Sequence, residues 1–321
     1  MTPRDLTSFR RALNRWYRAH GRHDLPWRQT RDPYAVLVSE VMLQQTQVSR
    51  VLLYYERWIS RWPDVASLAA AAPAEVIRAW SGLGYNRRAL HLHRTALAVA
   101  GDRGDFPEGI GQLEKLPGIG RYTAGAVACF ANGQRTTVTD TNISRVLARV
   151  VMGMAAPKDA TAAELSAAAE ALLPARGARD HNLALMDLGA LVCTARSPAC
   201  DACPVSRSCA WRAASKPITV VLAVKRERFE ATSRFARGRL IEALRGTPAL
   251  SENQLAGILP PAHRVQTAVY LAALERDGMV QRFGGSWSLP RQESRPPWPL
   301  ADHRPFACPS DYRMSIASPK L

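Results

Sequence analysis

Apolar side chains recur three and four residues apart along the first two thirds of the chain, and this spacing predicts a helical structure. One such stripe consists of Phe9, Leu13, Trp16 and Tyr17. Gly, Pro and Asp signals separate further predicted helices, over residues 34–60 (two helices), 64–79, 86–101, 109–116, 121–131, 141–153 and 161–173. No convincing strand pattern interrupts them, so we expect a mainly helical domain over residues 1–211.

The pattern changes after residue 211. Residues 212–230 are polar and basic, apart from one apolar patch, and are predicted to be a linker. Three helices follow, over residues 234–245, 251–258 and 262–277, and then a hairpin that turns at Gly284–Gly285. This order predicts a small winged-helix-like α+β unit over residues 231–290. Residues 291–321 are rich in proline and lack periodicity, so we expect them to be disordered.

Charge narrows the class of partner. The chain has 321 residues and a net charge of +16, which favours a polyanion such as nucleic acid. The N-terminus lacks the apolar core of a signal peptide, and no run of about 18 apolar residues occurs. We therefore expect a cytoplasmic, nucleoid-associated protein that binds DNA and no membrane.

Four of the six cysteines lie within 17 residues, with the spacing C-x6-C-x2-C-x5-C. They are Cys193, Cys200, Cys203 and Cys209. Such a group can hold a tetrahedral zinc ion or a [4Fe–4S] cluster. Structural zinc sites usually have two close C-x2-C pairs, and here there is one, so the spacing favours iron–sulfur. Disulfides would need an oxidising compartment, which nothing in the sequence indicates.

The segment LPGIGRYTAGAVACF, residues 116–130, predicts two helices joined by a tight turn through Gly118 and Gly120. Glycines let the backbone approach a partner closely, and the amides of the turn and of the next helix can bind an anion. This is typical of a helix-hairpin-helix that grips a DNA phosphate without reading sequence. The alternative is an ordinary interhelical turn.

Two further segments carry candidate carboxyl groups. Glu40 lies among Val, Leu and Met on a predicted helix, so its pKa should rise and make it a candidate general acid. Gln44 and Gln47 would share its face at i+4 and i+7 and could contact bases. Asp140 precedes a helix, with Asn142 and Arg145 in its first turns. Without further context, a solvated Glu and a helix N-cap are the commoner arrangements.

Taken in order, these motifs resemble the helix-hairpin-helix DNA glycosylases that carry an iron–sulfur cluster. Within that superfamily, PYAVLVSEVMLQQTQV and LMDLGALVC resemble adenine-specific mismatch glycosylases of the MutY type. The resemblance covers roughly residues 8–211. It implies a two-lobed helical fold ending in a [4Fe–4S] loop, and it implies that the substrate is double-stranded DNA containing a mispaired adenine. A monomer is expected.

The resemblance also implies roles for individual residues. Glu40 would protonate N7 of a flipped-out adenine, and Asp140 would stabilise the oxocarbenium ion. Tyr122 and Asn142 would support these two carboxyl groups. Substrate and DNA contacts are expected from Arg22, Trp27, Leu43, Gln44, Gln45, Tyr85, Gly118, Gly120 and Asp187. Of these, Gln45 and Tyr85 would wedge into the base stack. The cluster would shape a basic loop around Arg196 and Arg207.

The chain departs from the family pattern in several places. Tyr122 stands where endonuclease III-like relatives carry a catalytic lysine, so a monofunctional glycosylase without lyase activity is expected. Leu183 replaces a frequent glutamine, and Asn86 replaces a second aromatic residue. Residues 212–321 are too short and too helical for the Nudix-like domain of typical members, and they resemble the short extension of actinobacterial members.

Two alternatives to adenine excision remain at this stage. A glycosylase of the same fold could act on thymine or uracil opposite guanine, or on an oxidised pyrimidine. A non-catalytic iron–sulfur protein could bind DNA through a regulatory winged helix. The QQT segment and Tyr122 argue against the first alternative, and the presence of both Glu40 and Asp140 argues against the second.

Overall fold

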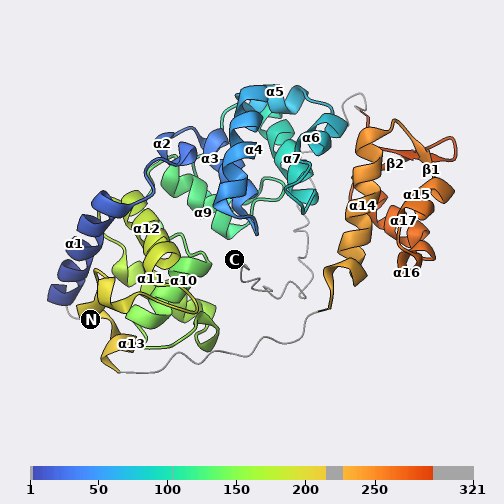
Figure 1. The fold of residues 1–321 in the computed structure, drawn as a ribbon. Coiled ribbons are helices and arrows are strands. Elements are labelled where there is room, and N and C mark those ends of the chain that lie inside the picture. Colours follow the sequence, from blue (N-terminus) through green and yellow to red (C-terminus); the bar gives the residue numbers. More distant parts are fainter. Residues whose placement is uncertain (1–2, 103, 215–226, 292–321) are drawn as a thin grey trace. The chain divides into compact units, whose positions relative to one another are not determined.

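The structure is a computed structural model that describes residues 3–102, 104–214 and 227–291 (Figure 1). The chain divides into two compact units. The first comprises residues 3–42, 52–70 and 91–232, and the second comprises residues 43–51, 71–90 and 233–291. Most of the predicted linker and nearly all of the predicted disordered tail lie outside the described residues.

The first unit is helical, as the sequence predicts. Its helices are α1 (Pro3–His20), α2 (Pro26–Gln29), α3 (Pro33–Leu43), α5 (Val65–Ala70), α8 (Ile110–Leu113), α9 (Arg121–Phe130), α10 (Thr141–Val150), α11 (Ala162–Leu172), α12 (Ala178–Asp187) and α13 (Ala210–Ala213), together with most of α4 (Val48–Arg61) and α7 (Arg87–Gly101). Helix α12 is central, because α1, α9 and α10 all pack against it. This packing places the ends of α9, α10 and α12 near one another.

Local signals explain where several helices begin. Asp140 caps α10 by accepting a hydrogen bond from the Ile143 amide at 2.6 Å. Thr161 and Glu164 form a capping box at the start of α11. The helix predicted over residues 64–79 is two helices, α5 and α6 (Pro73–Ala79), because Pro73 starts a new helix at its N1 position.

The central helix of this unit was not predicted from the sequence. Helix α12 covers residues 178–187 and continues as a π-helical turn, Leu188–Val192, which ends at Cys193. Short 3₁₀ turns, Cys200–Ala202 and Ser206–Ser208, then carry the chain through the other cysteines. A single π turn widens the helix locally, and such turns are frequent at functional sites.

The second unit contains the predicted winged-helix-like elements. They are α14 (Ser233–Gly246), β1 (Leu250–Ser251), α15 (Glu252–Ile258), α16 (Pro261–Arg264), α17 (Thr267–Arg276), β2 (Gln281–Phe283) and β3 (Ser286–Ser288). The strands form an antiparallel sheet in the order β1-β3-β2, with Leu250 and Arg282 opposite Trp287. Gly284 and Gly285 both have positive φ, 53° and 82°, which suits the two-residue hairpin predicted here.

The hydrophobic core of this unit includes residues from an earlier part of the chain. Ala74, Ile77 and Leu90 are buried together with side chains of α14, α15 and α17 and with Trp287. The amide of Ala74 also donates a hydrogen bond to the carbonyl of Pro290 at 3.1 Å. Residues 71–90 and 233–291 therefore share one core. The domain boundaries set from the sequence, at residues 211, 231 and 290, stay a prediction.

Candidate active site and metal centre

Glu40 lies in the middle of α3, where eight of its neighbours along the helix are buried with it. Its side chain is 8% exposed, and this burial raises the pKa of the carboxyl to about 7. The hydroxyl of Tyr122 hydrogen-bonds to the carboxyl and the charge of Arg28 lies nearby; both oppose this rise, whereas Asp140 adds to it. The rise that the sequence predicts is confirmed, and near neutral pH the group can donate a proton.

Asp140 is the second carboxyl of this group. Its Oδ1 accepts from the backbone amide of Ile143, and its Oδ2 accepts from the side-chain Nδ2 of Asn142 at 3.1 Å. Burial raises the pKa of Asp140 above its ordinary value, while these two donors and the charge of Arg145 oppose the rise. The residue therefore serves as an N-cap and also lies within electrostatic reach of Glu40 and Tyr122. The predicted catalytic residues are brought together.

The helix-hairpin-helix turn has the expected geometry. Gly118 has a φ of +78°, and a Cβ added there would lie 2.4 Å from the Cβ of His91, so only glycine fits without a shift. The hydroxyl of Thr95 donates to the carbonyl of Pro117 at 2.7 Å and fixes the turn. Gly120 is the N-cap of α9 and has open space around it. Tyr122 is the second residue of α9, so the same turn positions the residue that contacts Glu40.

Arg145 connects Asp140 with the cysteine loop. Its Nη2 donates to Asn142 Oδ1 at 2.8 Å and to the Gly189 carbonyl at 2.7 Å, and its Nε donates to the Cys193 carbonyl at 2.7 Å. Gly189 must be small, because a Cβ there would lie 2.7 Å from the Cβ of Asn142. A continuous path of hydrogen bonds therefore runs from the first cysteine of the loop to Asp140.

Asp187 is fully buried at the end of α12. Its two oxygens accept from Arg28, at 2.6 and 2.8 Å, and from the side chain and amide of Arg22, at 2.7 and 2.9 Å. Burial alone would raise the pKa of Asp187, but the two arginines hold it below its ordinary value. With no exposed surface, Asp187 would influence a substrate only by orienting these arginines. Arg28 was not found from the sequence, because nothing near it marks it as special.

Trp27 of α2 is buried with its ring edge-on to Tyr55, at a centroid distance of 5.3 Å. Its neighbours in this unit include Arg28, which is buried on the same short helix. The predicted contact of Trp27 with adenine stays a prediction.

The turn after α3 corrects one sequence prediction. The helix ends at Leu43, so Gln44 and Gln47 do not continue the helical face of Glu40 as predicted. Gln45, which is exposed, has a φ of +56°. Tyr85 has a φ of +46°, and these are the two non-glycine residues with positive φ among the described residues. Such backbone strain clusters at functional sites.

Arg88 holds both strained turns in the second unit. It is 8% exposed, and its guanidinium donates to the Gln44 carbonyl at 2.5 Å and to the Gly84 carbonyl at 3.1 Å. It also lies 5.5 Å from the centroid of the Tyr85 ring. The sequence did not mark Arg88, because its partners are backbone carbonyls of two turns that lie about 40 residues apart along the chain. The turns that carry Gln45 and Tyr85 are thereby coupled.

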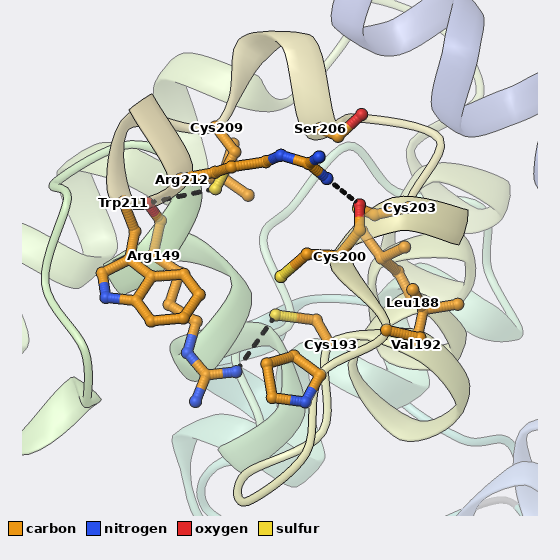
Figure 2. Close-up of a pocket in the computed structure, with 13 residues that line it drawn as sticks. Arg149, Leu188, Val192, Cys193, Cys200, Cys203, Ser206, Cys209, Trp211 and Arg212 are labelled. Atoms are coloured by element: carbon orange, nitrogen blue, oxygen red, sulfur yellow. Dashed lines mark hydrogen bonds between the residues drawn. The ribbon is translucent and has the colours of Figure 1, made fainter. Parts of the chain in front are cut away.

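The four clustered cysteines line one pocket (Figure 2). None of the five described cysteines forms a disulfide. Across residues 3–102, 104–214 and 227–291, no three His, Cys, Asp or Glu side chains are grouped closely enough for one metal ion. A [4Fe–4S] cluster uses one cysteine at each of its irons.

The surroundings of the pocket fit a metal cluster that is bound by thiolates. Burial raises the pKa of Cys203 to about 11 and also raises that of Cys209, so thiolates need a bound positive centre here. The buried guanidinium of Arg149 donates to the sulfur of Cys193 at 3.4 Å and lies over the Trp211 ring (Figure 2). Hydrogen bonds to cysteine sulfurs are typical of iron–sulfur sites.

Two protein-family models match the chain. Residues 38–173 match the family model of HhH-GPD superfamily base excision DNA repair proteins. Residues 193–209, which begin and end at cysteines of the group, match the iron–sulfur binding domain of endonuclease III. The cofactor of the chain is therefore a [4Fe–4S] cluster. No described helix is both long enough and apolar enough to cross a lipid bilayer.

Several curated relatives that resemble the chain have the same name. The adenine DNA glycosylase of Mycolicibacterium smegmatis is 46% identical over 83% of this chain and 90% of its own. The adenine DNA glycosylase of Mycobacterium tuberculosis is 43% identical over 86% and 91%. The human adenine DNA glycosylase is 43% identical over 65% of this chain and 40% of its own.

Solved structures confirm the architecture. A thermostable thymine-DNA glycosylase superposes with a TM-score of 0.61 at 30% identity, over 66% of this chain and 98% of its own. An endonuclease III in complex with DNA superposes with a TM-score of 0.58 at 21% identity, over 67% and 98%, and shows the fold alone. Because it is 46% identical to an adenine DNA glycosylase over most of both chains, the chain belongs to the adenine DNA glycosylase family of the HhH-GPD superfamily.

Proposed function

We propose that the protein is a monofunctional DNA glycosylase that hydrolyses the N-glycosidic bond of adenine mispaired with 8-oxoguanine or guanine. The observation that carries the proposal is the buried carboxyl of Glu40, with a pKa of about 7, beside the half-buried Asp140. Glycosidic hydrolysis needs two carboxyl groups in different environments. One stays neutral and can donate a proton, and the other is held in place by hydrogen-bond donors. The 46% identity to an adenine DNA glycosylase supports adenine as the base.

Glu40 acts first, as the general acid. Its proton passes to N7 of an adenine that has left the duplex, and the protonated base becomes a better leaving group. Tyr122 donates to the carboxyl and orients it. The bond between C1′ and N9 then breaks, and the electron pair stays with the base.

Asp140 acts on the sugar that remains. The oxocarbenium ion at C1′ is positive, so the Asp140 carboxylate stabilises it, and water then adds to C1′. Asn142 and the Ile143 amide hold the carboxylate in place. Tyr122 carries no amine, so no Schiff base forms with the sugar and the strand is not cleaved.

Recognition of the duplex falls to residues around these two groups. We assign adenine contacts to Arg22, Trp27 and Leu43, with Asp187 acting through Arg22 and Arg28. Gln45 and Tyr85 enter the base stack at the lesion, and Gln44 contacts the bases. The helix-hairpin-helix, with Gly118 and Gly120, binds a phosphate of the backbone.

The cysteine loop has a structural part in this scheme. Cys193, Cys200, Cys203 and Cys209 would each ligate one iron. The bound [4Fe–4S] cluster supplies a rigid crosslink of the loop rather than redox chemistry, and it presents Arg196 and Arg207 to the DNA backbone. The protein works as a monomer on the duplex DNA of the bacterial nucleoid.

The test is single-turnover excision on duplexes containing A·8-oxoG, A·G, A·C, T·G and U·G. We expect release of adenine from A·8-oxoG and A·G, slower release from A·C, and no release of thymine or uracil. Faster release of thymine from T·G than of adenine would contradict the proposal and favour the activity of the structurally similar thymine-DNA glycosylase. Binding of all five duplexes without release of any base would identify a non-catalytic DNA-binding protein.

A further inference from the structure

We propose that Arg234, on the first turn of α14, positions Tyr85, and that the C-terminal residues 233–291 are thereby part of the apparatus that enters the base stack. The inference rests on the proposed function in one respect, namely that Tyr85 meets the duplex at the lesion. It gives residues 233–291 a role in binding DNA, which the proposed function does not assign to them.

Tyr85 needs support from elsewhere, because its own backbone is strained. Its φ of +46° lies in the left-handed region, which is unfavourable for a non-glycine residue. Gly82 and Gly84, which precede it, also have positive φ, so the turn that leads into Tyr85 is tight. The side chain is 37% exposed, so packing alone does not fix it. A ring that must enter a duplex in one orientation gains from being held in advance.

Arg234 provides that support through two contacts. Its Nη1 donates to the Tyr85 hydroxyl at 2.5 Å, and its guanidinium carbon lies 5.2 Å from the centroid of the Tyr85 ring. The planar guanidinium thus contacts both the polar tip and the aromatic surface of the side chain. The first contact fixes the direction of the ring, and the second limits its rotation.

Neighbouring contacts hold α14 itself against the same turn. Arg245 donates to Asn86 Oδ1 at 2.9 Å and to the Ile77 carbonyl at 3.1 Å, and Glu242 accepts from the Ser81 hydroxyl at 3.3 Å. Buried side chains of α14 also belong to the core that residues 71–90 and 233–291 share. Helix α14 is therefore anchored along its length, and Arg234 at its start has a fixed base from which to hold Tyr85.

This arrangement also gives a role to Asn86. The side-chain oxygen of Asn86, the residue after Tyr85, is an acceptor for Arg245. A second aromatic ring would leave the Arg245 guanidinium without this acceptor. The sequence at residues 85–86 is thus matched to a C-terminal unit that docks on it.

The test compares four variants of the full-length protein: Arg234→Ala, Tyr85→Phe, the double variant, and Arg239→Ala as a control. Arg239 lies exposed on the same helix, so its removal changes the net charge equally. Binding is measured on a duplex that contains a tetrahydrofuran abasic analogue with 2-aminopurine beside it, whose fluorescence reports unstacking. Excision of adenine opposite 8-oxoguanine is measured separately under single-turnover conditions.

We expect Arg234→Ala to raise the dissociation constant, and the enzyme concentration that gives half-maximal excision, by roughly 3- to 10-fold. This is the effect of losing one charge-assisted hydrogen bond at a half-exposed site. The variant should also reduce the fluorescence signal. Tyr85→Phe should have a similar effect, and the double variant should lose clearly less than the product of the two. The pH dependence of the rate at saturation, which Glu40 sets, should be unchanged. Arg234→Lys should recover only part of the loss, because an ammonium lacks the planar fork.

Two results would overturn the inference. Equal effects of Arg234→Ala and Arg239→Ala would mean that only net charge matters, and independent losses from Arg234→Ala and Tyr85→Phe would mean that Arg234 contacts DNA directly. If Arg234→Ala unfolds the unit, Tyr85→Phe alone decides, since an unchanged affinity would remove the hydroxyl contact from any role. Because binding to the abasic analogue needs no excision, failure of adenine release would be seen separately.

Discussion

Glu40 is a carboxyl whose environment sets its proton affinity. Burial among apolar side chains raises its pKa to about 7, and Tyr122 and Arg28 oppose only part of that rise. The neutral form is therefore favoured in the folded protein up to near neutral pH. Because the pKa of Glu40 is raised on folding, the group lowers the free energy of unfolding as pH rises above the pKa that it has in the unfolded chain. The folded state then keeps a proton that the unfolded chain releases, and above about pH 7 it buries a charge.

The exchange Glu40→Gln removes the proton donor and keeps the shape of the side chain. We expect base excision to fall by about 10²- to 10⁴-fold, the range of general acid catalysis, with duplex binding unchanged. In the native enzyme, the excision rate should fall as pH rises through about 7. Single-turnover rates from pH 5 to 9 measure both effects, and a variant with full activity would remove Glu40 from its role.

The same exchange has an effect on stability with a definite sign. The glutamine never ionises, so Glu40→Gln should raise the melting temperature more at pH 8.5 than at pH 5, provided the amide finds the same partners. Thermal unfolding at the two pH values measures the difference. An equal shift at both pH values would mean that the pKa of Glu40 is not raised in the folded state.

Tyr122 decides what happens after the base has left. We expect borohydride to trap almost no covalent complex with DNA that contains the abasic product, because a phenol forms no imine. An adduct yield comparable to that of a lysine-bearing bifunctional glycosylase would contradict the monofunctional assignment. Denaturing gel electrophoresis measures the yield.

At this scale, residue chemistry was predictable where it depends on neighbours in the sequence. The raised pKa of Glu40 follows from the apolar residues around it, and the N-cap role of Asp140 follows from the helix that it precedes. Arg28 and Arg88 were missed, because their partners lie far away along the chain. A buried arginine has no local signature when it donates to distant carbonyls or to a distant carboxylate.

Among the elements, the turns matter more than the helices. Helix periodicity located α3, α9 and α10, but it also suggested that the face of Glu40 continues through Gln44, whereas α3 ends at Leu43. Periodicity does not detect a left-handed residue such as Gln45, since the strain there is imposed by tertiary contacts. The hairpin at Gly284–Gly285 was predictable, because two adjacent glycines favour that turn.

The contact of Arg88 with both strained turns can be tested directly. We expect Arg88→Ala to lower excision by 10-fold or more and to lower the melting temperature, because the carbonyls of Gln44, Leu83 and Gly84 lose a charged donor. Arg50→Ala, on an exposed residue whose guanidinium donates to the Gly82 carbonyl at 3.4 Å, is the matched control. Equal effects of the two exchanges would show that Arg88 has no special place.

The π turn after α12 carries the connection between the cysteine loop and Asp140. Replacing Arg145 by Gln should lower excision by roughly 10- to 100-fold with duplex binding retained, because Asn142 and the carbonyls of Gly189 and Cys193 lose their shared donor. Arg212→Gln, which also contacts the loop but bonds to Cys200 and Asp201, should keep excision. Equal losses would mean that any damage to the loop suffices.

For the whole molecule, the cluster is expected to contribute to folding. Replacing Cys203 by Ser should remove the yellow-brown absorbance of the cluster at about 400 nm. It should also lower the melting temperature by roughly 5 °C or more. Cys129→Ala, a buried cysteine outside the pocket, should keep the absorbance. Visible spectra and thermal unfolding give both values, and an unchanged spectrum of the Cys203 variant would mean that another group ligates the iron.

The fold class was predictable as a whole because helix periodicity, the glycine turn and the cysteine spacing are all local signals. The packing of residues 71–90 with residues 233–291 was not, since nothing in either segment identifies the other. Ala74, Ile77 and Leu90 look like ordinary core positions of the helical domain. Their partners follow only after a stretch that the sequence marks as a linker.

This shared core has a consequence for synthesis of the protein. About 140 residues separate Leu90 from α14, so at 5–20 residues per second the ribosome needs roughly ten seconds or more to deliver the partner of α6. During that interval Ile77 and Leu90 must stay in water or contact other surfaces. We therefore expect nascent chains that stop before residue 233 to recruit chaperones, and truncated enzymes to be poorly soluble for reasons unrelated to DNA.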